Sequence, residues 1–222
     1  YNRYVKALEK FEAFTISHEK FFDMTGQIIS FLYLYTAKIN RHFIEGSFED
    51  GLKLVPEINR LIKKYGRFID IHRIMVFNYK TAWLYLGSGN PGQSIEYLNK
   101  ILNLQSAGHL RTDIQCYARL MHLMAHFELH HFNLLEHLVD SVGRFFGKMR
   151  DLNEVQMVLF QFFKNNLDVG KHQLNHNLHA LKKEVLRLEK NPFEGRTFHH
   201  LDIVAWIDSR IEGKTVGEVI RK

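Results

Sequence analysis

The chain has 222 residues, a formal net charge of +6, and 45% hydrophobic and 13% aromatic side chains. A chain of this size and composition can bury a substantial core, as one domain or as one stacked array. No apolar run approaches the roughly 18 residues that a membrane span requires, so we expect no membrane partner. The single Cys116 excludes an internal disulfide framework and fits a reducing compartment, so we expect a cytoplasmic protein.

Apolar periodicity with helix start and stop signals predicts a succession of helices and no strand. Gly46 and Gly66 mark two helix ends, and Pro56 lies inside one expected helix, where it should cause a kink. The expected helices, in chain order, are Asn2–Phe14, His18–Glu45, Phe48–Tyr65, Ile69–Leu86, Gln93–Leu104, Leu110–His130, Phe132–Phe146, Leu152–Leu167, Lys171–Lys190 and Phe198–Ile211, with a short terminal turn at Thr215–Lys222.

Three stretches share one pattern of an apolar helix, a tight turn and an amphipathic helix: Ala37–Ile58, Ala82–Leu102 and Ala125–Val142. Such a unit cannot bury its apolar face alone and must stack on a neighbour. The sequence therefore predicts an all-α fold, an α-α superhelix of stacked antiparallel helix pairs. Residues 1–196 would form the array, with a truncated first unit, and residues 197–222 a C-terminal capping helix that shields the end of the array.

The turns and the second helices of these units carry recurring residues. Gly46-Ser47-Phe48, Gly87 and His130-His131-Phe132 occupy the turns, and Gly51, Ser94 and Leu135 lie near the starts of the second helices. The pattern resembles the tetratricopeptide (TPR) family, and the unit with Ala82, Gly87, Ser94, Ile95 and Leu102 matches best. The units recur about every 40 residues against roughly 34 in the standard repeat. Long, degenerate repeats of this kind are similar to those of bacterial regulators that sense peptides.

The segment Gly87–Gly92 (GSGNPG) matches the G-x-G-x-x-G dinucleotide fingerprint. That fingerprint binds a pyrophosphate only where a strand leads into a helix. Here the preceding run belongs to a helical pattern, so we interpret the segment as an extended repeat turn. A nucleotide-binding enzyme fragment at Gly87–Gly92 is the enzyme alternative, and no catalytic residues are expected.

Histidines recur at helical spacing in two places, His122/His126/His130 and His172/His176/His179. This spacing can place imidazoles on one helix face for a metal, but no cysteine or suitable carboxylate cluster joins either set. We therefore expect no metal and no cofactor.

Two basic clusters, around Arg60–Arg67 and Lys182–Lys190, are interrupted by glutamates. Cations in the last turn of a helix also suit its dipole. A nucleic-acid partner is therefore not expected, although basic patches can follow a phosphate backbone.

In TPR arrays the first helix of each pair lines a concave surface. Asn40 and Asn78 fall at places that hold asparagines in members that clamp a C-terminal carboxylate, but Thr36, Tyr117 and Met121 stand where the basic partners would be. The resemblance therefore implies a polar and aromatic groove for an extended or helical peptide. Its lining would be Tyr33, Thr36, Asn40, Phe77, Asn78, Thr81, Tyr85, Tyr117, Met124 and Glu128.

These observations favour a non-catalytic scaffold that binds a protein or peptide. Residue 1 is Tyr rather than Met, so we expect a fragment of a larger bacterial protein. Its exposed N-terminal end would be available for self-association. The alternative is a peptide-responsive regulatory domain that controls an attached effector.

Overall fold

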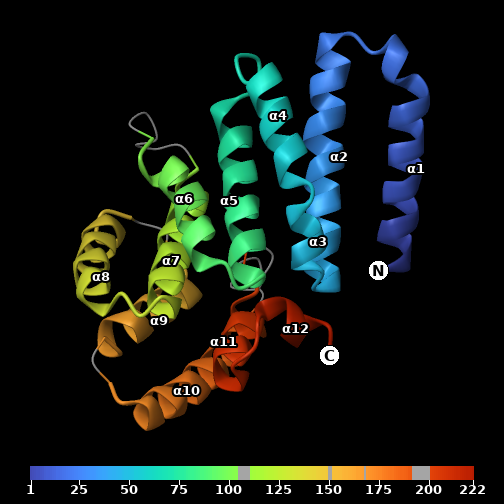
Figure 1. Ribbon diagram of the computed structural model, residues 1–222. Helices are drawn as coiled ribbons and strands as arrows, with labels where there is room; N and C mark the ends of the chain where they lie inside the picture. Colours follow the sequence, from blue (N-terminus) through green and yellow to red (C-terminus); the bar gives the residue numbers. More distant parts are fainter. Residues whose placement is uncertain (105–110, 150–151, 168, 192–200) are drawn as a thin grey trace.

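The computed structural model describes residues 1–104, 111–149, 152–167, 169–191 and 201–222. These residues are helical and contain no strand, which confirms the all-α fold (Figure 1). The first half contains α1 (Asn2–His18), the short 3-10 helix η1 (Glu19–Phe21), α2 (Met24–Glu45), α3 (Phe48–Leu52), α4 (Val55–Tyr65), α5 (Ile71–Gly87) and α6 (Pro91–Leu102). The second half contains α7 (Thr112–Glu128), α8 (Phe132–Phe146), α9 (Glu154–Asn165), α10 (Lys171–Glu189), α11 (Ile203–Glu212) and α12 (Val216–Ile220).

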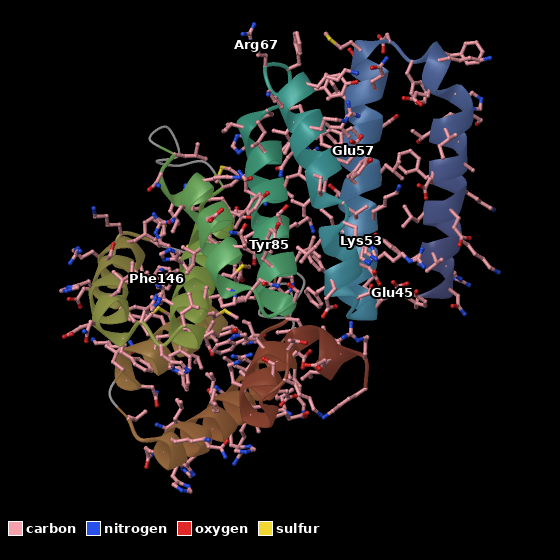
Figure 2. All side chains as sticks on the ribbon, viewed as in Figure 1. Glu45, Lys53, Glu57, Arg67, Tyr85 and Phe146 are labelled. Carbon is pink, nitrogen blue, oxygen red and sulfur yellow. The ribbon has the colours of Figure 1, made fainter. Side chains whose placement is uncertain are left out.

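The helices up to α10 pack as successive pairs. The first helices of the pairs, α2, α5, α7 and α9, contact one another in that order. Each second element also contacts the first helix of the next pair: α3 packs on α5, α6 on α7, and α8 on α9. Side chains fill the spaces between these helices (Figure 2). The stacking of helix pairs therefore provides the core that no single pair could form.

Several helix boundaries differ from the sequence prediction by a few residues, and two of the differences have clear local causes. The helix predicted from His18 begins at Met24, because the Asp23 side chain accepts a hydrogen bond from the Gly26 amide and caps the helix there. The helix predicted over Phe48–Tyr65 is split into α3 and α4. Pro56 takes the second position of α4, where the missing amide hydrogen costs no hydrogen bond. The predicted starts at Leu110 and Phe198 and the boundary at residue 196 lie outside the described residues.

Gly87, the last residue of α5, permits close packing between two helix pairs. A Cβ atom at this position would lie 2.2 Å from a ring carbon of Phe48, which is fully buried at the start of α3. The Phe48 ring also packs edge-on against Trp83 of α5, with 5.8 Å between ring centres. The recurring turn residues therefore hold the first pair against the second.

The C-terminal segment crosses the ends of the first helices. Trp206 of α11 is fully buried between the rings of Phe127 and Phe163. α12 contacts α2 and α5, and the Arg221 side chain donates a 2.7 Å hydrogen bond to the Gly46 carbonyl at the end of α2 (Figure 1, red). The segment thus packs on α10 and also joins the last helices of the array to its first pair.

Candidate interaction face

One side of α2 carries large side chains that the fold leaves exposed. Ile29, Tyr33 and Ile44 are 49%, 53% and 52% exposed, and the half-buried Asn40 lies between Tyr33 and Ile44. Residues spaced by about four or seven positions share one side of a helix, so these four lie along the same side of α2. We call Ile29, Tyr33, Asn40 and Ile44 the α2 stripe.

Two cations of α5 lie beside this stripe. The Arg73 guanidinium lies 5.5 Å from the centre of the Tyr33 ring. The Lys80 ammonium donates a 2.5 Å hydrogen bond to Oδ1 of Asn40, and it lies 5.4 Å from the centre of the Phe43 ring. Arg73 and Lys80 are seven residues apart, which is close to two helical turns, so both point to the same side of α5. The α2 stripe together with Arg73 and Lys80 is the interaction face.

The charge of Lys80 is not neutralised within the described part of the chain. No ion pair to a carboxylate forms there, and burial lowers the pKa of the Lys80 ammonium to about 8. Lys38, a half-buried residue of α2, differs from Lys80 because Glu12 of α1 forms an ion pair with it. Arg73 is exposed and likewise has no ion pair with a described carboxylate. The interaction face therefore presents two positive charges that no described carboxylate pairs with.

The structure separates the residues of the expected groove. Of the α2 residues, Tyr33 is exposed and contacts Arg73, Asn40 is half-buried and contacts Lys80, and Thr36 is half-buried.

The α5 residues of the expected groove lie elsewhere. The Tyr85 ring stacks on Tyr97 of α6, with 5.6 Å between centres, and the half-buried Asn78, seven residues earlier, shares that side of α5. This side faces away from Arg73. Phe77 stacks on Phe31 of α2 and is buried, and Thr81 is buried as well.

On α7, the three residues of the expected groove are buried or paired with other parts of the fold. Tyr117 and Met124 are buried. Glu128 accepts a 2.7 Å hydrogen bond from the Trp206 indole and forms an ion pair with Arg210. Its carboxylate therefore holds the C-terminal segment in place.

Sequence reasoning missed Ile29, Ile44, Arg73 and Lys80. A signal was present, because the α5 sequence IHRIMVFNYKTAWLYLG contains a basic pair at two-turn spacing and no acidic residue. Asp70, which caps α5, lies three residues before Arg73, but no acidic residue lies three or four positions from Lys80. A cation without an acidic neighbour at helical spacing has no counter-ion from its own helix.

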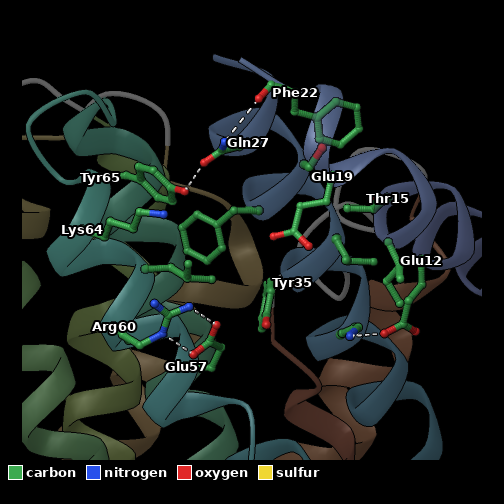
Figure 3. Close-up of a pocket in the computed structure, with 16 residues that line it drawn as sticks. Glu12, Thr15, Glu19, Phe22, Gln27, Tyr35, Glu57, Arg60, Lys64 and Tyr65 are labelled. Atoms are coloured by element: carbon green, nitrogen blue, oxygen red, sulfur yellow. Dashed lines mark hydrogen bonds and ion pairs between the residues drawn. The ribbon is translucent and has the colours of Figure 1, made fainter. Parts of the chain in front are cut away.

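A cleft of about 330 Å³ lies on the other side of α2, between α1 and α4 (Figure 3). Four of its charged groups form ion pairs, Lys38 with Glu12 and Arg60 with Glu57 at 2.6 Å. Glu19 and Lys64 also line the cleft, and the Lys64 ammonium lies over the Tyr65 ring. The Tyr65 hydroxyl donates to Gln27, and the Gln27 amide donates to the Phe22 carbonyl. The lining of the cleft thus contains both acidic and basic groups, whereas the charged groups of the interaction face, Arg73 and Lys80, are both positive.

The sequence raised two other possible sites, a nucleotide site at Gly87–Gly92 and a metal site at the histidine rows. A helix, α5, leads into the Gly87–Gly92 turn, and Gly89 has a φ of +81°, which a glycine adopts without strain. Within the described residues, no group of three or more His, Cys, Asp or Glu side chains is placed to hold a metal. His122 is buried against His126, and burial lowers the pKa of His122 to about 4. These histidines therefore pack at a helix seam.

Comparison of the chain with protein-family models gives no match. Comparison with curated proteins and with solved structures gives no significant match either. Among the described helices, none combines the length and the apolar character needed to cross a membrane. The chemistry of the interaction face is therefore the basis for assigning a function.

Proposed function

We propose that this chain is a non-catalytic, TPR-like scaffold of the cytoplasm that binds a partner protein or peptide through the interaction face. The observation that carries the proposal is the α2 stripe. Ile29, Tyr33 and Ile44 lie in one row on the same helix and are about half exposed, although the chain buries many other large apolar residues. Large apolar side chains exposed along one side of a helix, beside polar and charged groups, are a feature of many interaction sites.

The composition of the face supports protein binding in particular. Tyrosine and arginine are enriched among the residues that contribute most to protein interfaces, and here Arg73 stacks over Tyr33. An ordered pair of this kind loses little side-chain entropy on binding, because each side chain already restricts the other. Asn40 and Lys80 add hydrogen-bonding groups at the same surface.

Site-specific photocrosslinking tests this function. A benzoylphenylalanine residue at position 33 should crosslink a discrete partner in an extract of the source cells, and Ile29→Ser with Ile44→Ser should reduce that crosslink. The same probe at position 186, an exposed leucine on α10, is the matched control and should give no such product. Equal crosslinking at both positions, or none at position 33, would refute the proposed function.

A further inference from the structure

We infer that the interaction face, in the function proposed above, binds an acidic amphipathic helix with two carboxylates seven residues apart, one at Arg73 and one at Lys80. The two cations are seven residues apart on α5, which corresponds to about 10 Å along the helix axis. A partner helix that lies along α5 presents acidic side chains with the same separation when they are also two turns apart. The spacing of the cations thus defines the spacing of the acidic groups.

The Lys80 ammonium has hydrogen-bonding capacity left for a partner. An ammonium group donates three hydrogen bonds, and Asn40 accepts one of them. The other contact in the described structure is the face of the Phe43 ring. A carboxylate from a partner would supply acceptors and the missing negative charge together.

Burial makes a carboxylate at Lys80 more effective than one at an exposed lysine. Charge pairs on an open surface contribute about 0–1 kcal/mol, whereas screening is weaker where water is partly excluded. The lowered pKa of Lys80, about 8, reflects this partial exclusion of water. Arg73 is exposed, so we expect it to contribute mainly to the orientation of the partner helix.

The α2 stripe explains why the partner should be amphipathic. The stripe runs from Ile29 to Ile44, which is about 22 Å of helix at 1.5 Å per residue. A helix of similar length with apolar residues three and four apart would cover this row, as in other cases where a helix binds along an apolar surface. An acidic helix in the cleft between α1 and α4 would instead have to displace Glu12 and Glu57 from their own cations.

Synthetic peptides of about 18 residues, long enough to cover the stripe, test the inference by fluorescence anisotropy. Three peptides share an alanine-rich helical sequence with a leucine row and differ in two positions: Glu residues seven apart, Glu residues four apart, or Gln at both sites. We expect the peptide with seven-residue spacing to bind about tenfold more tightly than the other two, a difference of about 1.4 kcal/mol. Equal affinity for the Glu and Gln peptides would overturn the inference.

Charge-exchanged variants make the test specific to these residues. Arg73→Glu changes an exposed side chain, and it should shift the preference to a peptide with Lys at one end of the seven-residue pair. Lys80→Met should abolish the advantage of the seven-residue spacing over the four-residue spacing, whereas Lys38→Met, which lies outside the interaction face, should keep it. Circular dichroism would confirm that each variant is folded.

The outcomes also separate this inference from the proposed function. Partner capture at position 33 without any dependence on Arg73 or Lys80 would refute the acidic helix and leave the scaffold function standing. Tighter binding of an extended peptide with Glu residues three apart would refute the helical partner. Loss of capture at position 33 would refute the scaffold function itself.

Discussion

Replacement of Lys80 by Met should make the folded chain more stable at pH 7. The Lys80 ammonium is largely buried, and no described carboxylate forms an ion pair with it, so its charge is unfavourable in the folded state. Methionine has a similar length and no charge, and it can pack against Phe43 in the same space. A residue that is kept for binding can lower the stability of the fold, so replacing it can raise the stability.

The magnitude follows from the pKa of Lys80, which burial lowers from 10.5 to about 8. At about 1.4 kcal/mol per pKa unit, this difference corresponds to an upper limit of about 3 kcal/mol at pH 7. The variant also leaves Oδ1 of Asn40 without its donor, which costs about 1 kcal/mol. We therefore expect Lys80→Met to raise the free energy of unfolding by about 1–2 kcal/mol.

The change of folding stability with pH tests independently whether the Lys80 charge destabilises the folded chain. Between about pH 8 and 10.5 the unfolded chain keeps the Lys80 proton and the folded chain has lost it, so stability increases with pH relative to the variant. The advantage of Lys80→Met should therefore be full below pH 8 and disappear towards pH 10.5. Other groups titrate in this range, and the difference between the two proteins isolates Lys80.

Urea denaturation followed by circular dichroism at pH 7, 9 and 10 is the appropriate assay. Lys38→Met is the matched control, because removing the cation that is paired with Glu12 should not stabilise the fold. If Lys80→Met destabilises the chain at pH 7 as much as Lys38→Met does, then Lys80 has a counter-ion and the argument for a free positive charge is wrong.

Two further predictions concern the packing that positions the interaction face. Gly87→Ala should destabilise the fold by about 3 kcal/mol, because its Cβ would lie 2.2 Å from Phe48. Gly92→Ala, with no atom within 4 Å of the new Cβ, is the control and should be nearly neutral. Thermal unfolding of both variants checks this, and equal melting temperatures would contradict it. Arg221→Ala should lower the free energy of unfolding by about 1–2 kcal/mol, because the Gly46 carbonyl at the end of α2 loses its donor. Chemical denaturation measures this loss, and unchanged stability would show that the contact between Arg221 and α2 does not stabilise the fold.

The helical repeats could be predicted from the sequence because they depend on local signals. Apolar periodicity identifies most helices, and Gly46 does adopt the left-handed conformation expected at the end of α2. Pro56 was expected to kink a helix, and the chain separates into α3 and α4 just before it. The start of α2 was missed because a single side-chain cap at Asp23 decides it.

The site was less predictable because it depends on contacts between distant parts of the chain. Among the described residues no carboxylate pairs with Lys80, which depends on how α2 and α5 pack together, and its hydrogen-bond partner, Asn40, is 40 residues away in the sequence. Glu128 was expected in the groove, but Trp206, 78 residues later, occupies its carboxylate. Tyr85 was likewise expected in the groove, but α6 packs against that side of α5 and the Tyr85 ring stacks on Tyr97. Spacing along one helix shows which residues share a side, but the packing of neighbouring helices decides which side stays accessible.

Nuclear magnetic resonance mapping with the peptide that has Glu residues seven apart tests the central claim most directly. Titration of this peptide into the 15N-labelled chain should shift the amide signals of residues 29–44 on α2 and residues 73–80 on α5. The Arg73→Glu variant, matched by an Arg60→Glu control in the cleft, should lose these shifts while the control keeps them. Shifts centred instead on Glu12, Arg60 and the rest of the cleft between α1 and α4, or no shifts at all, would contradict the assignment of the interaction face.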